Sequence, residues 1–439
     1  MSVDRLRIPR TLKPCFRWQA IARLSVAILC GWVVLFAGQT AICQSQGLPA
    51  RIDQSWDKLF TTRQGWTGGD GGGTVDLGNG RVLWMFADSF VGGVADGKHS
   101  PGSHMINNAF AVQSVNNRSE PKLKEFDFSW GPLGTDRKPT AWLVPDPFVM
   151  SPARKIKPFS KPHGWFWPAG GGCVVEEKGK RRLFVFMFHM GATGETGVWG
   201  FENIGGAMAV IEDHSRPIGQ WKVRQIDLPF TKDALREQGQ ADVEPALLET
   251  NWGLSCVGAS ESGQHPESAY LYVYGDQHSK YKDRELLVAR VRPGEIEDFG
   301  RWEFFSGTHG WVRDVEQVEP IATKIGAEFS IEKVTFQGQE KYVMVHSHHL
   351  LGTKIFIRTA DAPEGPWTKP RAVYEVPDVK KSKNYFTYAA RGHAMVSPEG
   401  QLLITYIVNS NDFWEMAADA SIYRPRCITV PLELIFGWE

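Results

Sequence analysis

Two aspartates flank a predicted tight turn early in the chain. Asn79-Gly80 favours a two-residue hairpin turn, because both residues tolerate positive φ. Asp70 lies nine residues before Asn79, and Asp88 lies nine residues after it. A hairpin without bulges therefore brings the two carboxylates nearly opposite each other. Neighbouring carboxylates differ in pKa, which suits acid and base catalysis. The alternative is local: Asp70 caps a loop and Asp88 ends a strand.

Glycines surround the first of these aspartates, at positions 68, 69, 71, 72 and 73. Glycine has no side chain to block a ligand, so a ligand can approach the backbone closely. This feature favours a functional site over a purely structural turn.

The same hairpin pattern recurs along the chain. A strand of small residues, a polar turn and an apolar strand follow one another in residues 66–90, 167–189, 251–276, 327–348 and 388–409. Most of these hairpins are followed by a second strand pair. Four-stranded antiparallel units that repeat five times close radially. We therefore predict an all-β fold, a five-bladed β-propeller over residues 50–439.

Polar residues collect at one end of these hairpins when each is reflected about its turn. In a propeller the first strand of each blade lines the central channel, so we expect these residues to form one pocket. The alternative is that wet strand ends prefer polar residues anyway. Besides Asp70 and Asp88, the residues predicted at this end are His189, Asp276, Glu328, His348 and Asn409, with Arg391 and His393 just inside. Arg391 could bind an acidic group of the substrate or pair with Asp88 or Glu328.

Three tryptophans begin predicted inner strands, namely Trp66, Trp167 and Trp252. Indole rings stack well on sugars, so we predict substrate-binding roles for them. Packing in the core is the alternative for each.

The charge balance and an N-terminal targeting signal limit the possible partners and location of the protein. The chain has 49 basic and 49 acidic residues and no basic tract after its first residues, which argues against nucleic acid as a partner. Residues 24–37 form an apolar run behind a basic segment, which is typical of a signal peptide. We predict a signal peptide over residues 1–45, cleaved after Cys43, and a secreted or periplasmic product without stable membrane association. Retention as an anchor is the alternative.

Three cysteines remain after the predicted cleavage, at positions 173, 256 and 427. Their neighbours are small or apolar, so we expect buried thiols. No zinc-binding spacing is present. We predict no required metal and no cofactor.

Several short motifs stand out along the chain: WTGGDG (66–71), LWMFADSF (83–90), NNAF (107–110), AEFSI (327–331), APEGPW (362–367) and YRPR (423–426). With these motifs the chain resembles secreted five-bladed propellers of unknown function related to the endo-D-arabinanases, and more distantly the furanosidase propellers. This resemblance implies a glycoside-hydrolase-like fold. Some furanosidase propellers carry calcium, so calcium stays open. Within NNAF we predict that Asn107 and Asn108 bind substrate.

Glycoside hydrolysis needs an acid and a second carboxylate. We predict Asp70 as base or nucleophile, Asp88 as the neighbour that tunes charge or positions water, and Glu328 as general acid. Glu332 is an alternative acid, because residues 328 and 332 share one face of the predicted strand. Asp276 is a second alternative.

These features predict a hydrolase that acts on a furanose-containing polysaccharide or oligosaccharide, similar to an arabinanase. A non-catalytic propeller that binds glycan or protein is the main alternative. A propeller enzyme of another class, such as a lyase, is a third.

Overall fold

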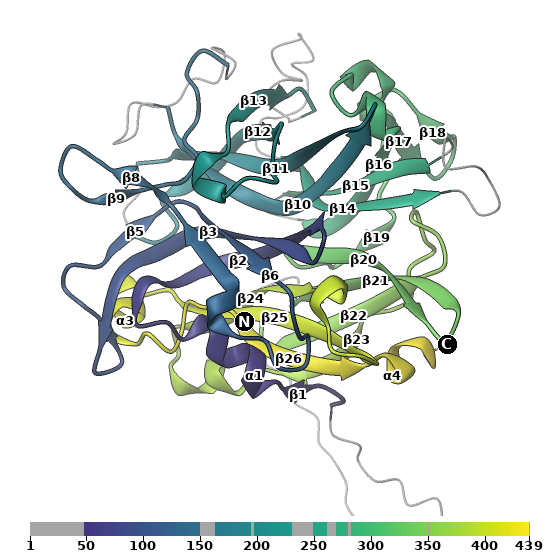
Figure 1. Cartoon of the computed structure of the whole chain (residues 1–439). Helices are drawn as coiled ribbons and strands as arrows, with labels where there is room; N and C mark the ends of the chain where they lie inside the picture. The colour runs from purple at the N-terminus through teal and green to yellow at the C-terminus, as the bar shows by residue number, and fades with distance from the viewer. Residues whose placement is uncertain are drawn as a thin grey trace, which may run out of the picture. The chain divides into compact units, whose positions relative to one another are not determined.

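The computed structural model describes residues 48–149, 163–194, 197–230, 249–260, 269–279, 282–348 and 352–438. The predicted signal peptide and its cleavage site lie outside these residues. In the described part, five antiparallel sheets form a ring, which confirms the predicted five-bladed β-propeller (Figure 1).

Each blade has four main strands, ordered from the channel outwards. Blade 1 contains β2 (Gln64–Gly78), β3 (Arg81–Ala95), β6 (Ala109–Ser114) and β7 (Phe126–Ser129). Blade 2 contains β10 (Trp165–Glu177), β11 (Lys180–Ala192), β12 (Phe201–Ile211) and β13 (Val223–Leu228). Blade 3 contains β14 (Glu249–Ser260), β15 (Ala269–Ser279), β16 (Lys282–Val291) and β17 (Glu303–Ser306). Blade 4 contains β20 (Phe329–Phe336), β21 (Gln339–Ser347), β22 (Lys354–Ala360) and β23 (Arg371–Glu375). Blade 5 contains β24 (Tyr385–Gly392), β25 (Gln401–Ser410), β26 (Arg426–Pro431) and β1 (Arg51–Ile52).

Shorter elements decorate the blades. The extra strands are β4 (Lys98–His99), β5 (His104–Ile106), β8 (Gly131–Leu133), β9 (Pro139–Thr140), β18 (Gly310–Val312) and β19 (Ala322–Thr323). The α-helices are α1 (Gln54–Asp57), α3 (Phe413–Ala418) and α4 (Leu432–Phe436). The 3₁₀ turns are Lys58–Phe60, Leu123–Glu125, Ile218–Gln220, Pro293–Glu295, Phe299–Arg301, Val315–Gln317, Pro377–Lys381 and Ala394–Val396. Within the described ranges, no helix has the length and apolar character of a membrane span.

The ring closes because a strand from the start of the described chain completes the last blade. The inner strands touch in the order β2, β10, β14, β20, β24, and β24 touches β2. The early strand β1 pairs with β26, with Arg51 opposite Thr429, and so becomes the outer strand of blade 5. Figure 1 shows this purple strand beside the yellow β26. The sequence analysis did not identify this strand, because two residues are too short for a periodic pattern.

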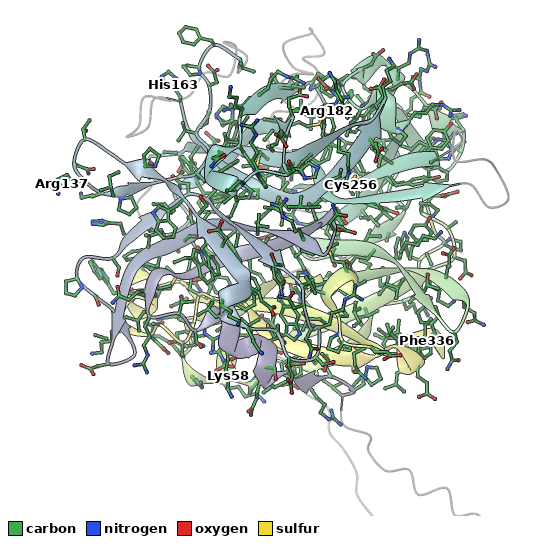
Figure 2. All side chains as sticks on the ribbon, viewed as in Figure 1. Lys58, Arg137, His163, Arg182, Cys256 and Phe336 are labelled. Carbon is green, nitrogen blue, oxygen red and sulfur yellow. The ribbon has the colours of Figure 1, made fainter. Side chains whose placement is uncertain are left out.

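Apolar side chains fill the interfaces between neighbouring blades (Figure 2). Five clusters of buried residues each bridge one pair of blades. Blades 5 and 1, for example, share a cluster that includes Trp84 and Leu403. Burial of such side chains contributes roughly 25 cal/mol per Å² of apolar surface, so these interfaces hold the blades at fixed positions around the channel.

The inner strands are rich in glycine because they almost touch. A Cβ atom on Gly73 would overlap the backbone of Gly170, and a Cβ atom on Gly171 would overlap the carbonyl oxygen of Gly253. Larger residues at these positions would force blades 1, 2 and 3 apart. The glycine run therefore has a structural reason as well as the predicted functional one.

The first hairpin turns at Asn79 and Gly80, as predicted, with φ of 53° and 70°. The prediction of a hairpin without bulges is wrong, since Gly73 faces Met85, Gly71 faces Phe86 and Gly69 faces Ser89. One bulge adds a residue to β2 and the next adds one to β3. The two shifts offset each other. Asp70 therefore still lies opposite the Ala87–Asp88 segment of β3.

Candidate active site

Asp70 lies in the bulged part of β2, where hydroxyl groups from blade 5 surround one of its oxygens. Tyr388 and Tyr423 both donate hydrogen bonds to Oδ2, and the bond from Tyr423 measures 3.1 Å. The other oxygen, Oδ1, is buried and has no hydrogen-bond partner among the described residues. The carboxyl group is therefore held through one oxygen only.

The surroundings of Asp70 favour its neutral form. Burial and the charges of Glu328 and Asp88 raise the pKa of Asp70 well above its ordinary value, against a lowering by the two tyrosine hydroxyls. The pKa values of Tyr388 and Tyr423 are also raised by burial, so both remain protonated donors. The structure thus brings three carboxyl groups from blades 1 and 4 into electrostatic contact.

Asp88 lies on β3 and is fixed by nitrogen donors from two blades. Its Oδ1 accepts a hydrogen bond of 2.7 Å from the indole of Trp167 and one of 3.0 Å from the amide of Asn107. The structure therefore brings Trp167 and Asn107 to the predicted site. Donors of this kind favour the ionised carboxylate.

Glu328 precedes the inner strand of blade 4 and pairs with a buried cation. Its Oε2 lies 3.1 Å from Nη2 of Arg391. The Glu328 side chain keeps 20% of its exposure, whereas that of Arg391 keeps 1%. Glu328 therefore keeps some contact with solvent, whereas its guanidinium partner has almost none.

Arg391 spans the central channel. Its guanidinium group donates to the carbonyl oxygens of Leu254 and Ala169, both at 3.0 Å, and to that of Phe329. These carbonyls belong to three other blades. The predicted substrate-binding role does not fit this arrangement: Arg391 is buried and joins blades 2, 3 and 4 to blade 5.

The site can now be compared with known proteins. A model of the family described as "Domain of unknown function (DUF5005)" matches residues 53–438. The chain belongs to this family. No curated protein matches its sequence.

Solved structures align with this DUF5005 protein. A Bacteroides ovatus protein, provisionally described as a hydrolase, aligns with a TM-score of 0.62 and 18% identity, over 89% of this chain and 92% of that one. An α-L-arabinofuranosidase from Clostridium thermocellum aligns with a TM-score of 0.35 and 12% identity, over 82% and 93%. An exo-β-1,3-galactanase from Phanerochaete chrysosporium aligns at 0.39 and 10%, over 89% and 65%. The first likeness shows the fold; a specific relation to the endo-D-arabinanases stays a prediction.

Three predicted binding residues of the DUF5005 chain are buried in its framework. Trp66 is 1% exposed and stacks on Phe128, with ring centroids 4.9 Å apart. Trp252 is 2% exposed and packs on Phe304. Asn108 is fully buried and bonds to the backbone of Leu143 and Phe166. The predicted sugar-binding roles are wrong for these three residues, because no ligand can reach them.

Two predicted histidines are also buried. The Nε2 atom of His189 pairs with the carbonyl of His163 at 2.9 Å. His393 lies between Thr74 and Thr405 at 3.0 and 2.7 Å, and burial lowers its pKa to about 3. His393 is therefore neutral and structural, and neither histidine faces the carboxyl cluster.

Asp276 is fully buried in a polar network of blade 3. It pairs with Arg284 and accepts a 2.9 Å hydrogen bond from Asn251. Because its cation is supplied within its own blade, the alternative assignment of Asp276 as the acid is wrong.

The remaining two predicted residues, Asn409 and His348, lie in different surroundings. Asn409 donates a 3.1 Å hydrogen bond to the hydroxyl of Tyr388 and so supports the Asp70 network. His348 lies against Phe356, with ring centroids 6.1 Å apart.

Sequence reasoning missed the two tyrosines. Tyr388 opens the fifth repeat and Tyr423 opens the YRPR motif, but neither position signals a contact with a residue more than 300 positions away. Hairpin symmetry relates residues within a blade, whereas these contacts cross between blades.

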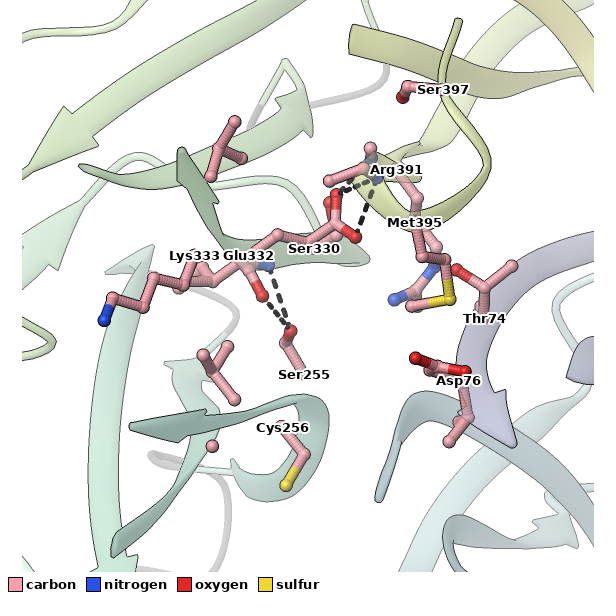
Figure 3. Close-up of a pocket in the computed structure, with 18 of the residues that line it drawn as sticks. Thr74, Asp76, Ser255, Cys256, Ser330, Glu332, Lys333, Arg391, Met395 and Ser397 are labelled. Atoms are coloured by element: carbon pink, nitrogen blue, oxygen red, sulfur yellow. Dashed lines mark hydrogen bonds between the residues drawn. The ribbon is translucent and has the colours of Figure 1, made fainter. Parts of the chain in front are cut away.

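A cavity of about 840 Å³ lies at the turn end of the inner strands, away from the three carboxyl groups. Figure 3 shows Glu332, Ser255, Thr74 and Cys256 around it. Both oxygens of Glu332 accept the backbone N–H of Ala394, at 3.0 Å each, and burial raises the pKa of Glu332 to about 7. The cavity does not include Asp70, Asp88 or Glu328 among its lining residues.

Glu332 is thereby separated from Glu328, although the two side chains share one strand face. Four residues of strand span roughly 13 Å. Glu332 cannot replace Glu328 as acid beside Asp70, so this alternative is wrong.

The cysteines carry free thiols in the described structure. Cys173 and Cys427 are buried, as predicted, and Cys256 is partly exposed. Among the described residues, no three histidine, cysteine or acidic side chains are arranged to hold a metal ion. Whether the protein needs a metal stays a prediction.

Proposed function

We propose that this protein is a glycoside hydrolase that acts on a furanose-containing polysaccharide at the mouth formed by Asp70, Asp88 and Glu328. The observation that carries the proposal is the setting of Asp70: its carboxyl group accepts two tyrosine hydroxyls, and burial and the charges of Glu328 and Asp88 raise its pKa. Hydrolysis of a glycosidic bond needs one carboxylic acid and one carboxylate. The folds of the B. ovatus protein and of the arabinofuranosidase agree with this class.

Asp70 is the proton donor in this proposal. Its Oδ2 accepts both tyrosine hydroxyls, so Oδ1 is the oxygen that carries the proton. A buried anionic oxygen without a donor would be costly. The proton passes from the Asp70 carboxyl group, which is only partly buried as a whole, to the oxygen of the leaving sugar as the glycosidic bond breaks.

Glu328 is the complementary carboxylate, either as base for water or as nucleophile. The acid and the carboxylate must flank the scissile bond. Asp88 shares a hairpin with Asp70, whereas Glu328 comes from blade 4 and keeps part of its exposure. Asp88 instead holds the indole of Trp167 and, through its charge, the proton on Asp70.

These roles reverse the ones inferred from the sequence. Sequence position alone offered no reason to prefer either carboxyl group as acid. Burial and the tyrosine contacts supply that reason, because they act on Asp70 and not on Glu328.

A screen of polysaccharides for released reducing ends tests the class. We expect cleavage of an arabinan or another furanose-containing polymer, and a 10²- to 10⁴-fold loss of turnover in Asp70→Asn. Full activity in that variant ends the catalytic assignment. Binding of a glycan without cleavage by the wild type would favour the non-catalytic alternative.

Aryl glycosides with good leaving groups test the roles. Such substrates need little protonation, so Asp70→Asn should lose far less activity on them than on the polysaccharide. Glu328→Gln should lose activity on both. The opposite pattern would restore the roles inferred from the sequence.

Export is a further part of the proposal. The basic segment and apolar run of residues 1–45 favour cleavage after Cys43 and a secreted or periplasmic location. N-terminal sequencing of the exported protein tests it, and a mature chain beginning at Met1 would indicate an anchor.

A further inference from the structure

Aromatic rings form a continuous series between the two aspartates of the candidate site. Each ring lies within 6.1 Å of the next, centroid to centroid. The rings, in order, belong to Trp167, Phe201, Trp199, Phe386 and Tyr388. The first ring donates its N–H to Asp88, and the last donates its hydroxyl to Asp70.

This series joins two blades that are not neighbours. Trp167 and Phe201 belong to strands β10 and β12 of blade 2, and Phe386 and Tyr388 belong to β24 of blade 5. Blade 1 lies between them in the ring. The residue that connects the two halves is Trp199, which precedes β12.

Trp199 is fixed from both sides. Its ring lies 6.1 Å from that of Phe201 and 5.9 Å from that of Phe386. Its indole N–H donates to Oδ1 of Asn411, which follows β25 in blade 5, at 3.2 Å. The preceding Val198 packs against the apolar cluster shared by blades 4 and 5. The ring is therefore held in place before any ligand arrives.

Trp199 nevertheless stays open to solvent, with 51% of its surface exposed. Holding a large apolar ring at the surface is unfavourable unless a ligand covers it. A ring ordered in advance binds without a further entropic penalty. Trp414 on α3 offers a contrast: it is 75% exposed, but its recorded ring contact is with its neighbour Phe413, and it does not touch the series.

We propose that Trp199 is the platform on which one sugar ring of the substrate stacks, and that it sets the position of the glycosidic bond relative to Asp70. The inference rests on the proposed hydrolase function and names the residue that positions the substrate. The ligand it fits is a sugar ring with an apolar face, which packs on indole through C–H groups.

The test compares Trp199→Ala, Trp199→Phe and the control Trp414→Ala on the polysaccharide that the wild type cleaves. We expect Trp199→Ala to raise KM by about 10-fold, which corresponds to about 1.4 kcal/mol. The change in kcat should be smaller, and Trp199→Phe should restore most of the loss. Trp414→Ala should match the wild type.

The outcomes separate this inference from the function on which it rests. Cleavage by the wild type with equal KM values in Trp199→Ala and Trp414→Ala overturns the platform alone. A wild type that neither cleaves nor binds any polysaccharide overturns the hydrolase proposal and the platform together. Loss of kcat without a change in KM would also contradict a binding platform.

Discussion

The two ends of the central channel hold acidic side chains in different environments. At one end, Asp70, Asp88 and Glu328 act on one another, and hydrogen bonds from other blades fix each of them. At the other end, Glu332 lines a cavity of about 840 Å³ and accepts a single backbone N–H. Burial alone raises the pKa of Glu332, whereas Asp70 also responds to two neighbouring charges. A raised pKa therefore marks both ends, but only at the Asp70 end do neighbouring carboxyl groups contribute to it.

Arg391 stands between these ends. Because it bonds to carbonyls of three blades and to Glu328, it closes the channel and supplies a cation to the mouth with the three carboxyl groups. Cavity size alone would direct attention to the other end. In this propeller, electrostatic interaction between carboxyl groups indicates the candidate catalytic end of the channel better than the presence of a cavity does.

Replacing Arg391 should have the largest effect. Arg391→Met leaves three buried carbonyls without their donor and Glu328 without its cation, so we expect a loss of about 3–5 kcal/mol of unfolding free energy. Urea denaturation measures it. The control is Arg216→Met, whose 61% exposed side chain pairs with Asp213; that change should cost less than about 1 kcal/mol.

If Arg391→Met does not fold, Arg391→Lys keeps the charge but has too few donors for all four acceptors, and it should be destabilised by a smaller amount. Equal stability of Arg391→Lys and the wild type would mean that the cross-channel bonds contribute little.

Asp70→Asn should change how stability depends on pH. The pKa of Asp70 is raised in the folded protein, so the folded state binds this proton more tightly than the unfolded chain, whose Asp value is about 3.9. Wild-type stability is therefore lost as pH rises through the folded pKa. Asn does not titrate, so the free energy of unfolding of the variant should increase relative to that of the wild type as pH rises. Unfolding midpoints measured from pH 4 to 9 test this.

Asp213→Asn is the matched control with the opposite sign. Hydrogen bonds from Ser215 and Arg216 lower the pKa of Asp213, so its contribution is present at higher pH and lost in acid. The variant should lose stability relative to the wild type as pH rises towards the ordinary Asp value of about 3.9, and the difference should stay constant at higher pH, so the control is measured from pH 2 upwards. A pH-independent difference for Asp70→Asn would contradict a raised pKa at that site.

The sequence predicts the fold far better than it predicts the contacts of the site. Hairpin periodicity and the Asn79 turn are local, so they survive folding unchanged. The burial of Trp66 and Trp252 depends on neighbouring strands, and the bonds of Arg391 depend on three other blades. A polar residue at an inner strand can face a ligand or another blade, and one chain's pattern does not distinguish these environments. Asp70 and Asp88 were found because their relation lies within one hairpin.

Tyr388→Phe should shift the pH profile of activity moderately. The hydroxyl of Tyr388 lowers the pKa of Asp70, so its removal raises that pKa further. The loss of activity in alkali should move to higher pH, because Asp70 must be protonated to act as acid. We expect a stability cost of about 1 kcal/mol for the lost hydrogen bond. Tyr423→Phe should move the profile in the same direction by less, and a shift to lower pH in either variant would contradict the acid role.

Glu332→Gln should have the smallest effect on activity, because Glu332 lies at the cavity end of the channel. Activity on the polysaccharide should stay within about 2-fold of the wild type, since a substitution remote from the reacting groups leaves transition-state binding unchanged. Gln keeps an oxygen that can accept the N–H of Ala394, so the fold should hold. The pKa of Glu332 is raised to about 7, so wild-type stability should fall between about pH 4.3 and 7, because the unfolded chain releases this proton in that interval while the folded protein keeps it. The variant lacks this group, so its advantage over the wild type should grow across that interval and then level off. Unfolding midpoints and turnover measured at the same pH values separate the two ends of the channel: a large loss of turnover in Glu332→Gln would show that the cavity end takes part in the chemistry.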